Sequence, residues 1–144
     1  MIQRCHDTQF MNSIANQRAV RPFVDYRGSD SPMDFAPLAE RCTKTGIVSI
    51  SNGEDAFALF VMTGETEYQV HTFFGESCRG RKAIETGREM VEWLFERGAE
   101  RIWGATPLTN RQARWFNRQV GGRAIGRDEY EVEGDVEIFE IVKH

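Results

Sequence analysis

Three cations and a glycine gather in one short segment of the chain, Cys78-Arg79-Gly80-Arg81-Lys82. The segment lies between an apolar stretch that favours a strand and a periodic stretch that favours a helix. Free backbone N–H groups and the positive end of the helix dipole meet at such a point, so it suits a phosphate. Cations at this end of a helix cost about 0.3–1 kcal/mol each unless an anion is bound. The segment therefore predicts an anion-binding loop, with a solvated basic loop as the alternative.

Polar side chains also cluster where the next predicted helix begins. Asn110 stands at its start, and Arg111, Arg114 and Arg118 follow at spacings of three and four residues. This spacing places the three arginines on one face of a helix. Such a face points either into water or toward a phosphate, and the stripe alone does not decide between the two.

Two further side chains are of types that carry out acid–base or nucleophilic chemistry. His71 lies within an apolar stretch, where a buried, hydrogen-bonded histidine and a catalytic base both fit the pattern. Cys78 stands beside Arg79, which favours a thiolate nucleophile, but no Asp–His pair accompanies it. The sequence shows no residue spacing typical of a metal site, so we expect no metal.

Composition places the chain among ordinary globular domains. The 144 residues carry a net charge of −4, with 40% hydrophobic and 28% charged residues. We expect a single domain over residues 1–144, large enough to bury a hydrophobic core. The acidic balance argues against a dedicated nucleic-acid binder, although a local basic face leaves nucleic acid open as a partner.

Cysteine content and hydropathy bear on the compartment. The three cysteines, Cys5, Cys42 and Cys78, form no CxxC motif, so we expect reduced thiols in a cytosol-like compartment. The N-terminal residues lack the apolar core of a signal peptide. The longest apolar run, residues 56–62, is too short to span a bilayer, so no membrane partner is expected. These features together predict a cytoplasmic protein.

Apolar alternation, helical periodicity and turn residues define the expected elements. Strands are predicted at residues 2–5, 46–51, 56–63, 68–74, 101–106, 123–130 and 135–142, the last two joined by a turn at Gly134. Helices are predicted from Asp7 to before Pro22, at 34–42, at 83–97 and from Thr109 or Asn110 to Gly121, with a loop at 26–32. The nearly all-apolar strand 56–63 is expected inside the sheet. The strand–helix–strand run from 68 to 106 predicts a crossover between parallel strands, and so a mixed α+β fold.

The stretch 67–122 resembles the GNAT superfamily of acyl-CoA N-acyltransferases. That family carries a loop of the form Arg/Gln-x-x-Gly-x-Gly/Ala between its fourth strand and third helix. Residues 79–84 are similar to this loop, with a lysine and an isoleucine in place of two small residues. Residues 101–106 are similar to the family's fifth strand, and the run from Asn110 to Gly121 is similar to the motif that follows. The loose motifs are similar to those of small phage-encoded members of the family.

The resemblance implies a GNAT-like fold whose fourth and fifth strands splay apart. It implies acetyl-CoA, or another acyl-CoA, as cosubstrate lodged between these strands. In the family the fourth strand pairs with the pantetheine arm, the loop amides hold the diphosphate, and an asparagine on the following helix bonds the pantetheine. The residues so implied for the cofactor are Phe73, Phe74, Arg79, Gly80, Arg81, Lys82, Ala83, Asn110, Arg114 and Asn117.

The implied reaction is transfer of an acetyl or other acyl group to a primary amine. The acceptor would be a small molecule, a protein lysine or a modified base. In the family, a glutamate or a water removes the amine proton and a tyrosine protonates the leaving thiolate. The candidate catalytic residues are Glu67, His71 and Glu76 as bases, and Tyr130 and Tyr68 as acids.

The main departure from the family concerns its usual tyrosine. Asn117 stands at that position with Phe116 beside it, and neither side chain can donate a proton as a general acid. A catalytically inactive GNAT-like binding or assembly protein is therefore the alternative function. The sequence leaves a homodimer open.

Overall fold

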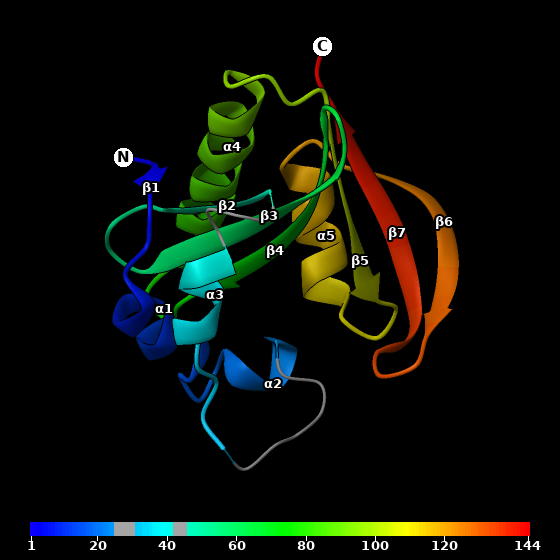
Figure 1. Cartoon of the computed structure of the whole chain (residues 1–144). Helices are drawn as coiled ribbons and strands as arrows, with labels where there is room; N and C mark the ends of the chain where they lie inside the picture. The colour runs from blue at the N-terminus through cyan, green and yellow to red at the C-terminus, as the bar shows by residue number, and fades with distance from the viewer. Residues whose placement is uncertain (25–30, 42–45) are drawn as a thin grey trace.

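A seven-stranded mixed sheet organises the chain (Figure 1). The computed structural model describes residues 1–24, 31–41 and 46–144, without the side chains of 39–41. The strands lie in the order β1-β2-β3-β4-β5-β7-β6. They are β1 (Gln3–Arg4), β2 (Ile47–Ser51), β3 (Ala56–Gly64), β4 (Glu67–Phe74), β5 (Arg101–Pro107), β6 (Arg123–Tyr130) and β7 (Gly134–Val142). The helices are α1 (Thr8–Ala15), α2 (Arg21–Val24), α3 (Ala36–Arg41), α4 (Arg81–Phe95) and α5 (Arg111–Gln119).

Helices pack on both faces of the sheet (Figure 1). On one face, α1 and the segment leading into α3 form a core cluster with the stacked rings of Phe57 and Phe73, whose centres are 4.4 Å apart. On the other face, α4 and α5 form a second cluster with the strands. Its buried members include Phe60, Met90, Leu94, Ile102, Val120, Phe139 and Ile141. The sheet is thus the middle of three layers.

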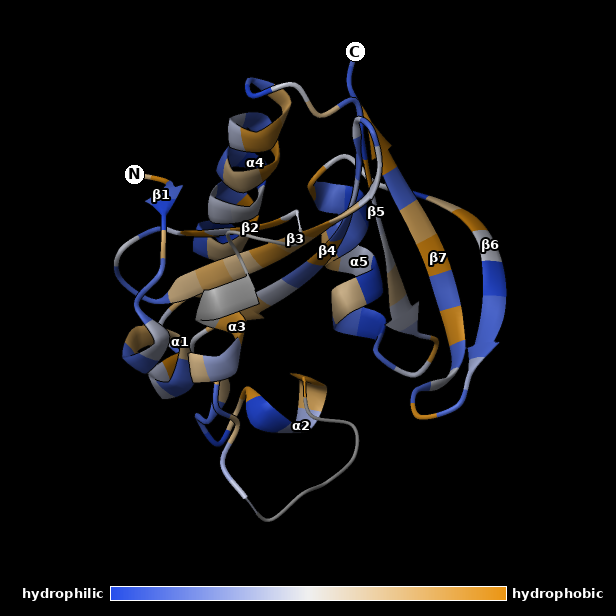
Figure 2. Ribbon diagram, viewed as in Figure 1, coloured by the Kyte–Doolittle hydropathy of each residue, from blue (hydrophilic) through white to orange (hydrophobic). Residues whose placement is uncertain are grey.

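Much of this architecture is what the local patterns predict. The parallel pairing of β4 with β5 confirms the predicted crossover, and the apolar strand β3 lies inside the sheet between β2 and β4. Figure 2 shows the contrast between apolar β3 and the polar edge strand β6. Asp7 and Asn110, at which helices were predicted to start, cap α1 and α5, each accepting a hydrogen bond from the N–H three residues further on.

The element bounds around the prolines and glycines differ from the prediction. The first helix ends at Ala15, which agrees with the predicted end before Pro22, but an unpredicted short helix begins at Arg21. Pro22 fits there because the first turn of a helix needs no N–H donor from it. Helix α4 begins at Arg81 instead of residue 83. Strand β7 begins at Gly134, so the last turn lies just before the predicted position.

Some predictions fall outside the described residues. They are most of the loop at 26–32 and the end of the helix at Cys42. Within the described part, Cys5 and Cys78 are buried free thiols. No helix among the described residues is long and apolar enough to cross a membrane. The same residues contain no cluster of His, Cys, Asp and Glu able to hold a metal ion.

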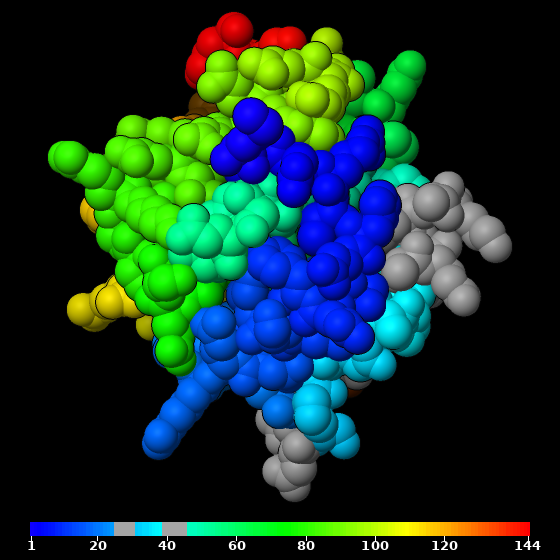
Figure 3. Space-filling model, turned by 90° about the vertical axis from the view of Figure 1, so that its left-hand side faces the viewer, coloured from blue at the N-terminus to red at the C-terminus, as the bar shows by residue number. Residues whose placement is uncertain are grey.

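The N-terminal residues lie against helix α4. Strand β1 pairs with β2 at the edge of the sheet, and the guanidinium of Arg4 lies 5.4 Å from the ring centre of Trp93. Figure 3 shows the N-terminal residues, in dark blue, next to the yellow-green of α4. This cation–π contact attaches the edge of the sheet to the helix.

Helices α4 and α5 approach each other closely at Gly87. A Cβ atom there would lie 2.7 Å from Cζ of Phe116 and 2.9 Å from Cγ1 of Val120. The ring of Phe116 also packs on Phe74 of β4, with 5.1 Å between ring centres. Helix α5 therefore contacts both α4 and the end of β4.

We expect Gly87→Ala to lower the free energy of unfolding by about 1–2 kcal/mol. Overpacking costs about 1–3 kcal/mol, and the helical preference for alanine over glycine offsets about 0.5–1 kcal/mol of that loss. Urea unfolding followed by circular dichroism measures the change. Gly126→Ala is the control, because a Cβ atom there meets nothing within 4 Å. Equal losses in the two variants would contradict the close packing at Gly87.

Candidate active site

Strands β4 and β5 pair over a short stretch and then separate. Their parallel pairs are Glu67 with Arg101, Tyr68 with Ile102 and Gln69 with Trp103. Beyond these pairs, β4 continues along β3 as far as Phe74, while β5 continues along β7 as far as Pro107. Each strand thus keeps a ladder on its outer side and, among the described residues, has no strand partner on its inner side. The result is a wedge whose backbone groups are available to a ligand.

Helix α5 closes the wedge on one face of the sheet. Phe116 packs on Phe74 of β4, while Nδ2 of Asn117 donates a 2.9 Å hydrogen bond to Oγ1 of Thr106 on β5. Asn117 and Thr106 are both buried. The helix therefore contacts each of the two separated strands.

The loop that follows β4 presents backbone N–H groups. Gly80 precedes α4 with φ +60° and ψ −132°, a conformation that favours glycine. In the part of the chain that the structure describes, no acceptor bonds the N–H groups of residues 79–83. The side chains of Arg79 and Arg81 are exposed. With the dipole of α4, these groups are suited to an anion.

Comparison with known proteins identifies the architecture. No protein-family model and no curated protein sequence matches the chain. The aminoglycoside acetyltransferase AAC(6')-Ib, in complex with coenzyme A and kanamycin, matches with a TM-score of 0.79 at 14% identity, over 99% of this chain and 94% of that one. A spermidine N-acetyltransferase SpeG chimera from Vibrio cholerae and hSSAT matches with a TM-score of 0.77 at 12% identity, over 99% of this chain and 94% of that one. A ribosomal-protein-alanine N-acetyltransferase from Brucella melitensis matches with a TM-score of 0.76 at 12% identity, over 99% of both chains.

The chain has the fold of the GNAT acetyltransferases. This finding confirms the predicted fold class, including the separated central strands. At these identities the likeness concerns the fold alone, and it does not bear on a phage source.

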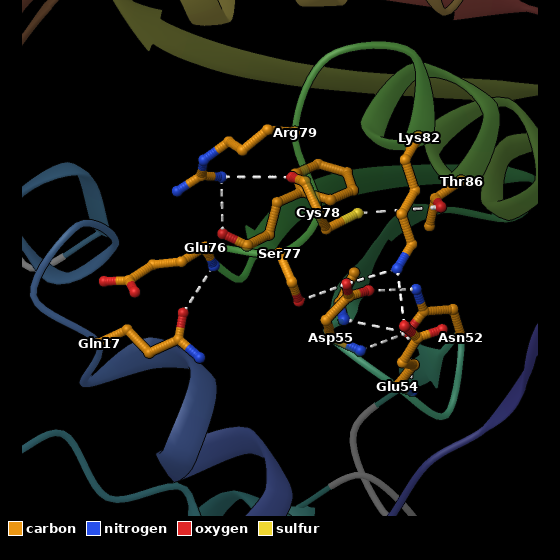
Figure 4. Close-up of polar contacts among 12 residues, drawn as sticks. Gln17, Asn52, Glu54, Asp55, Glu76, Ser77, Cys78, Arg79, Lys82 and Thr86 are labelled. Atoms are coloured by element: carbon orange, nitrogen blue, oxygen red, sulfur yellow. Dashed lines mark hydrogen bonds and ion pairs between the residues drawn. The ribbon is translucent and has the colours of Figure 1, made fainter.

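A buried carboxylate supports the loop of this GNAT fold (Figure 4). Asp55 accepts hydrogen bonds from Nζ of Lys82 at 2.7 Å, Oγ of Ser77 at 2.7 Å and Nδ2 of Asn52 at 2.8 Å. Burial by itself raises the pKa of Asp55, but these hydrogen bonds outweigh it and lower the pKa to about 2. The hydrogen bond to Asp55 also raises the pKa of Lys82, with a smaller contribution from Glu54. Both side chains are therefore charged at neutral pH.

The polar residues predicted for the loop have different surroundings. Lys82 is bound to two carboxylates, whereas Arg79 donates from Nη1 to the carbonyl oxygen of Phe74 at 2.9 Å, across the end of β4. Cys78 is fully buried, and burial raises its pKa. A neutral, enclosed thiol is a poor nucleophile, so the structure disfavours that alternative.

Three residues implied for the cofactor, Asn110, Arg114 and Asn117, make contacts that support α5. Oδ1 of Asn110 accepts from the N–H of Ala113 at 3.1 Å. Arg114 lies 2.9 Å from the carboxylate of buried Glu137 and donates to the carbonyl oxygen of Leu108 at 3.2 Å. Asn117 is bonded to β5 as described above. The arginine stripe is thus divided, because Arg114 is paired inside the protein while its two neighbours, Arg111 and Arg118, are exposed.

The three predicted bases lie at different points along β4. Glu67 is at the closed end of the wedge, where it accepts from Nη1 of Arg101 at 2.5 Å. Glu76 lies beyond the end of the strand, and its carboxylate accepts from the N–H of Ala19 at 3.3 Å. His71 is exposed and lies in the part of β4 that has left β5. Of the three, His71 borders the open part of the wedge.

A glutamate that sequence reasoning missed lies near this part of the site. Desolvation by the surrounding protein lowers the pKa of His71, although the residue is exposed at the surface. The charge of Glu133 raises this pKa by a smaller amount. Desolvation raises the pKa of Tyr130, and the charges of Asp128 and Glu133 raise it further. The charge of Glu133 reaches His71, so the turn between β6 and β7 lies within electrostatic range of the open part of β4. Tyr68, by contrast, packs against the core under α4 and α5.

We expect Asp55 to make stability fall in strongly acidic solution. Its folded-state pKa of about 2 lies below the ordinary 3.8. Its stabilisation is therefore complete above about pH 4, and it is lost as the pH falls toward about 2. The contribution is on the order of 2 kcal/mol. Urea unfolding of the wild type and Asp55→Asn between about pH 6 and pH 2 measures it, and a pH-independent difference between the two would contradict this interpretation.

Proposed function

We propose that the protein transfers an acetyl group from acetyl-CoA to a primary amine. The observation that carries the proposal is the early separation of β4 from β5 beside a loop with free N–H groups. An elongated thioester fits this wedge, because its amides can pair with an unpaired strand edge while its diphosphate meets the loop. Solved structures of the same fold are named as acetyltransferases, one of them in complex with coenzyme A.

In this proposal three parts of the chain hold acetyl-CoA. The backbone of Phe73 and Phe74 borders the wedge and pairs with the pantetheine arm. The N–H groups of residues 79–83 bind the diphosphate, assisted by the exposed side chains of Arg79 and Arg81. Asn110 opens the helix on the opposite side of the wedge. Its oxygen caps the helix, while its amide nitrogen bonds no described residue and can bond the pantetheine.

The acid–base roles follow from position and pKa. Acetyl-CoA supplies an activated thioester, and the acceptor nitrogen forms a bond to the carbonyl carbon while the carbon–sulfur bond breaks. His71 removes a proton from the acceptor nitrogen, since its lowered pKa keeps the imidazole neutral at neutral pH. Tyr130 protonates the leaving thiolate, since its raised pKa keeps the hydroxyl protonated.

A coenzyme-binding protein without catalysis is the second candidate. Asn117 occupies the position of the usual GNAT tyrosine, and its amide is bonded to Thr106 in a buried contact. That side chain stabilises the wedge but supplies no proton. Binding is common to both candidates, so product formation separates them.

We expect acetyl-CoA to bind and to stabilise the folded chain. At about 100 times Kd the gain is about 2.7 kcal/mol at 25 °C, which thermal unfolding detects. Arg81→Ala should weaken binding by about three- to tenfold, because it removes an exposed cation beside the free N–H groups. Arg118→Ala removes an exposed arginine of α5 as the matched control. A wild type that shows no stabilisation would overturn the proposed function.

We expect His71→Gln to lower kcat by about 10²-fold or more with little change in Kd for coenzyme A. Glu67→Gln should lower kcat much less, because that carboxylate is paired with Arg101 at the closed end of the wedge. Thiol release from acetyl-CoA with a panel of amines, including an aminoglycoside, spermidine and a peptide with an N-terminal alanine, measures both. The wild-type rate should rise with pH through a pKa below the ordinary 6.5 of histidine and then level off.

Two other results would change the assignment. A larger loss in Glu67→Gln than in His71→Gln would make Glu67 the base. Coenzyme binding without thiol release for any amine would favour the second candidate.

A further inference from the structure

We propose that Asp55 is a positioning residue that holds the phosphate-binding loop in shape, with Lys82 as its tether and not as a ligand of the diphosphate. The inference rests on the proposed function, because it concerns how the loop receives coenzyme A. Asp55 lies immediately before β3, far from the loop in sequence. No feature of the sequence pattern connects it to the loop.

Asp55 contacts the loop at three points (Figure 4). Its backbone carbonyl accepts from the N–H of Gly75 at 2.7 Å, directly after β4. Its Oδ2 accepts from Oγ of Ser77 at 2.7 Å and from Nζ of Lys82, in the first turn of α4, at 2.7 Å. Residues 79–81 of the segment with free N–H groups therefore lie between two attachments to one residue, at Ser77 and Lys82.

The turn between β2 and β3 holds Asp55 from the other side. Nδ2 of Asn52 donates to Oδ1 of Asp55 at 2.8 Å, while Oδ1 of Asn52 accepts from three successive N–H groups, those of residues 54–56. A Cβ atom on Gly75 would lie 2.8 Å from the carbonyl oxygen of Asp55, so the turn and the loop meet backbone to backbone. The carboxylate is thus fixed independently of the loop that it supports.

The two carboxylates on Lys82 differ in their surroundings. Asp55 lies 2.7 Å from Nζ with its side chain 5% exposed, whereas Glu54 lies 2.9 Å away with its side chain 70% exposed. Water screens the pair with Glu54, while loss of the pair with Asp55 leaves a buried carboxylate without its counter-charge. Asp55 is therefore the partner that fixes Lys82.

This asymmetry also determines which cations meet a diphosphate. If the Lys82 ammonium moved to a bound anion, the buried carboxylate of Asp55 would lose its counter-charge, and an unpaired buried charge destabilises the fold. Arg81, by contrast, is exposed, and its side chain has no bond to any described residue. The diphosphate consequently meets backbone N–H groups and arginine, and Lys82 stays on Asp55.

The test compares coenzyme A with pantetheine, which lacks the diphosphate and the nucleotide. By isothermal titration, Asp55→Asn and Lys82→Met should each raise Kd for coenzyme A by about tenfold, because the free N–H groups lose their alignment. Kd for pantetheine should stay within about twofold of the wild-type value. Glu54→Gln removes the exposed carboxylate from the same ammonium and should change Kd for coenzyme A by less than about twofold.

Circular dichroism and urea unfolding show whether each variant folds. Ser77→Ala removes one bond to Asp55 and provides a milder variant if Asp55→Asn does not fold. It should raise Kd for coenzyme A by about threefold and leave pantetheine binding unchanged.

The outcomes separate this inference from the proposed function. If the wild type binds no coenzyme A, both the proposed function and the positioning role of Asp55 are wrong. If it binds and Asp55→Asn binds as tightly or more tightly, the positioning role alone is wrong, and the released Lys82 is a diphosphate ligand. Equal losses for coenzyme A and pantetheine, or an equal loss in Glu54→Gln, would also overturn the positioning role.

Discussion

The short ladder between β4 and β5 is the constraint on which the site depends. Each strand is bonded along its outer side to an antiparallel neighbour, so it keeps its place in the sheet after the two have separated. Among the described residues, separation leaves the inner backbone groups without a strand partner, and an extended ligand that carries amides can bond them. Helix α5 maintains the opening, since Phe116 contacts β4 and Asn117 contacts β5.

The charges of the protein divide into structural and available groups. Buried acids hold several arginines and one lysine in place, in the pairs Asp55 with Lys82, Glu137 with Arg114, and Glu140 with Arg101 and Arg123. These pairs join elements of the sheet to one another or to a helix. Arg79 and Arg81 stay exposed at the loop. A chain with a net charge of −4 can therefore offer an anion a local concentration of positive charge.

Local signals accounted for much of the fold. Asp7 and Asn110 were identifiable as caps because a cap acts on the N–H groups of the next few residues. The start of α4 was placed too late, because the first turn of a helix shares with a loop its unbonded N–H groups and its polar composition. Helix α2 was missed because Pro22 was interpreted as the end of a helix, whereas it lies in the first turn of another.

Residue roles depended more on distant contacts than on local pattern. Lys82 and Arg114 were assigned to the cofactor from their positions in motifs, yet both are bound to carboxylates, of Asp55 and Glu137. Glu133 carried no signal, since it is one of several acidic residues near a turn. Its electrostatic effect on His71 exists only in the folded sheet, where β5 separates β7 from β4.

The sequence by itself determined the place of the basic loop between a strand and a helix, the order of the strands and the crossover. All of these follow from residue types within a few turns of one another. Only the tertiary structure decided how far β4 and β5 pair, and which charged side chains are free. The physical reason is separation along the chain: Asp55 and Lys82 are 27 residues apart and Glu67 and Arg101 are 34 apart, so these charges meet only in the folded sheet.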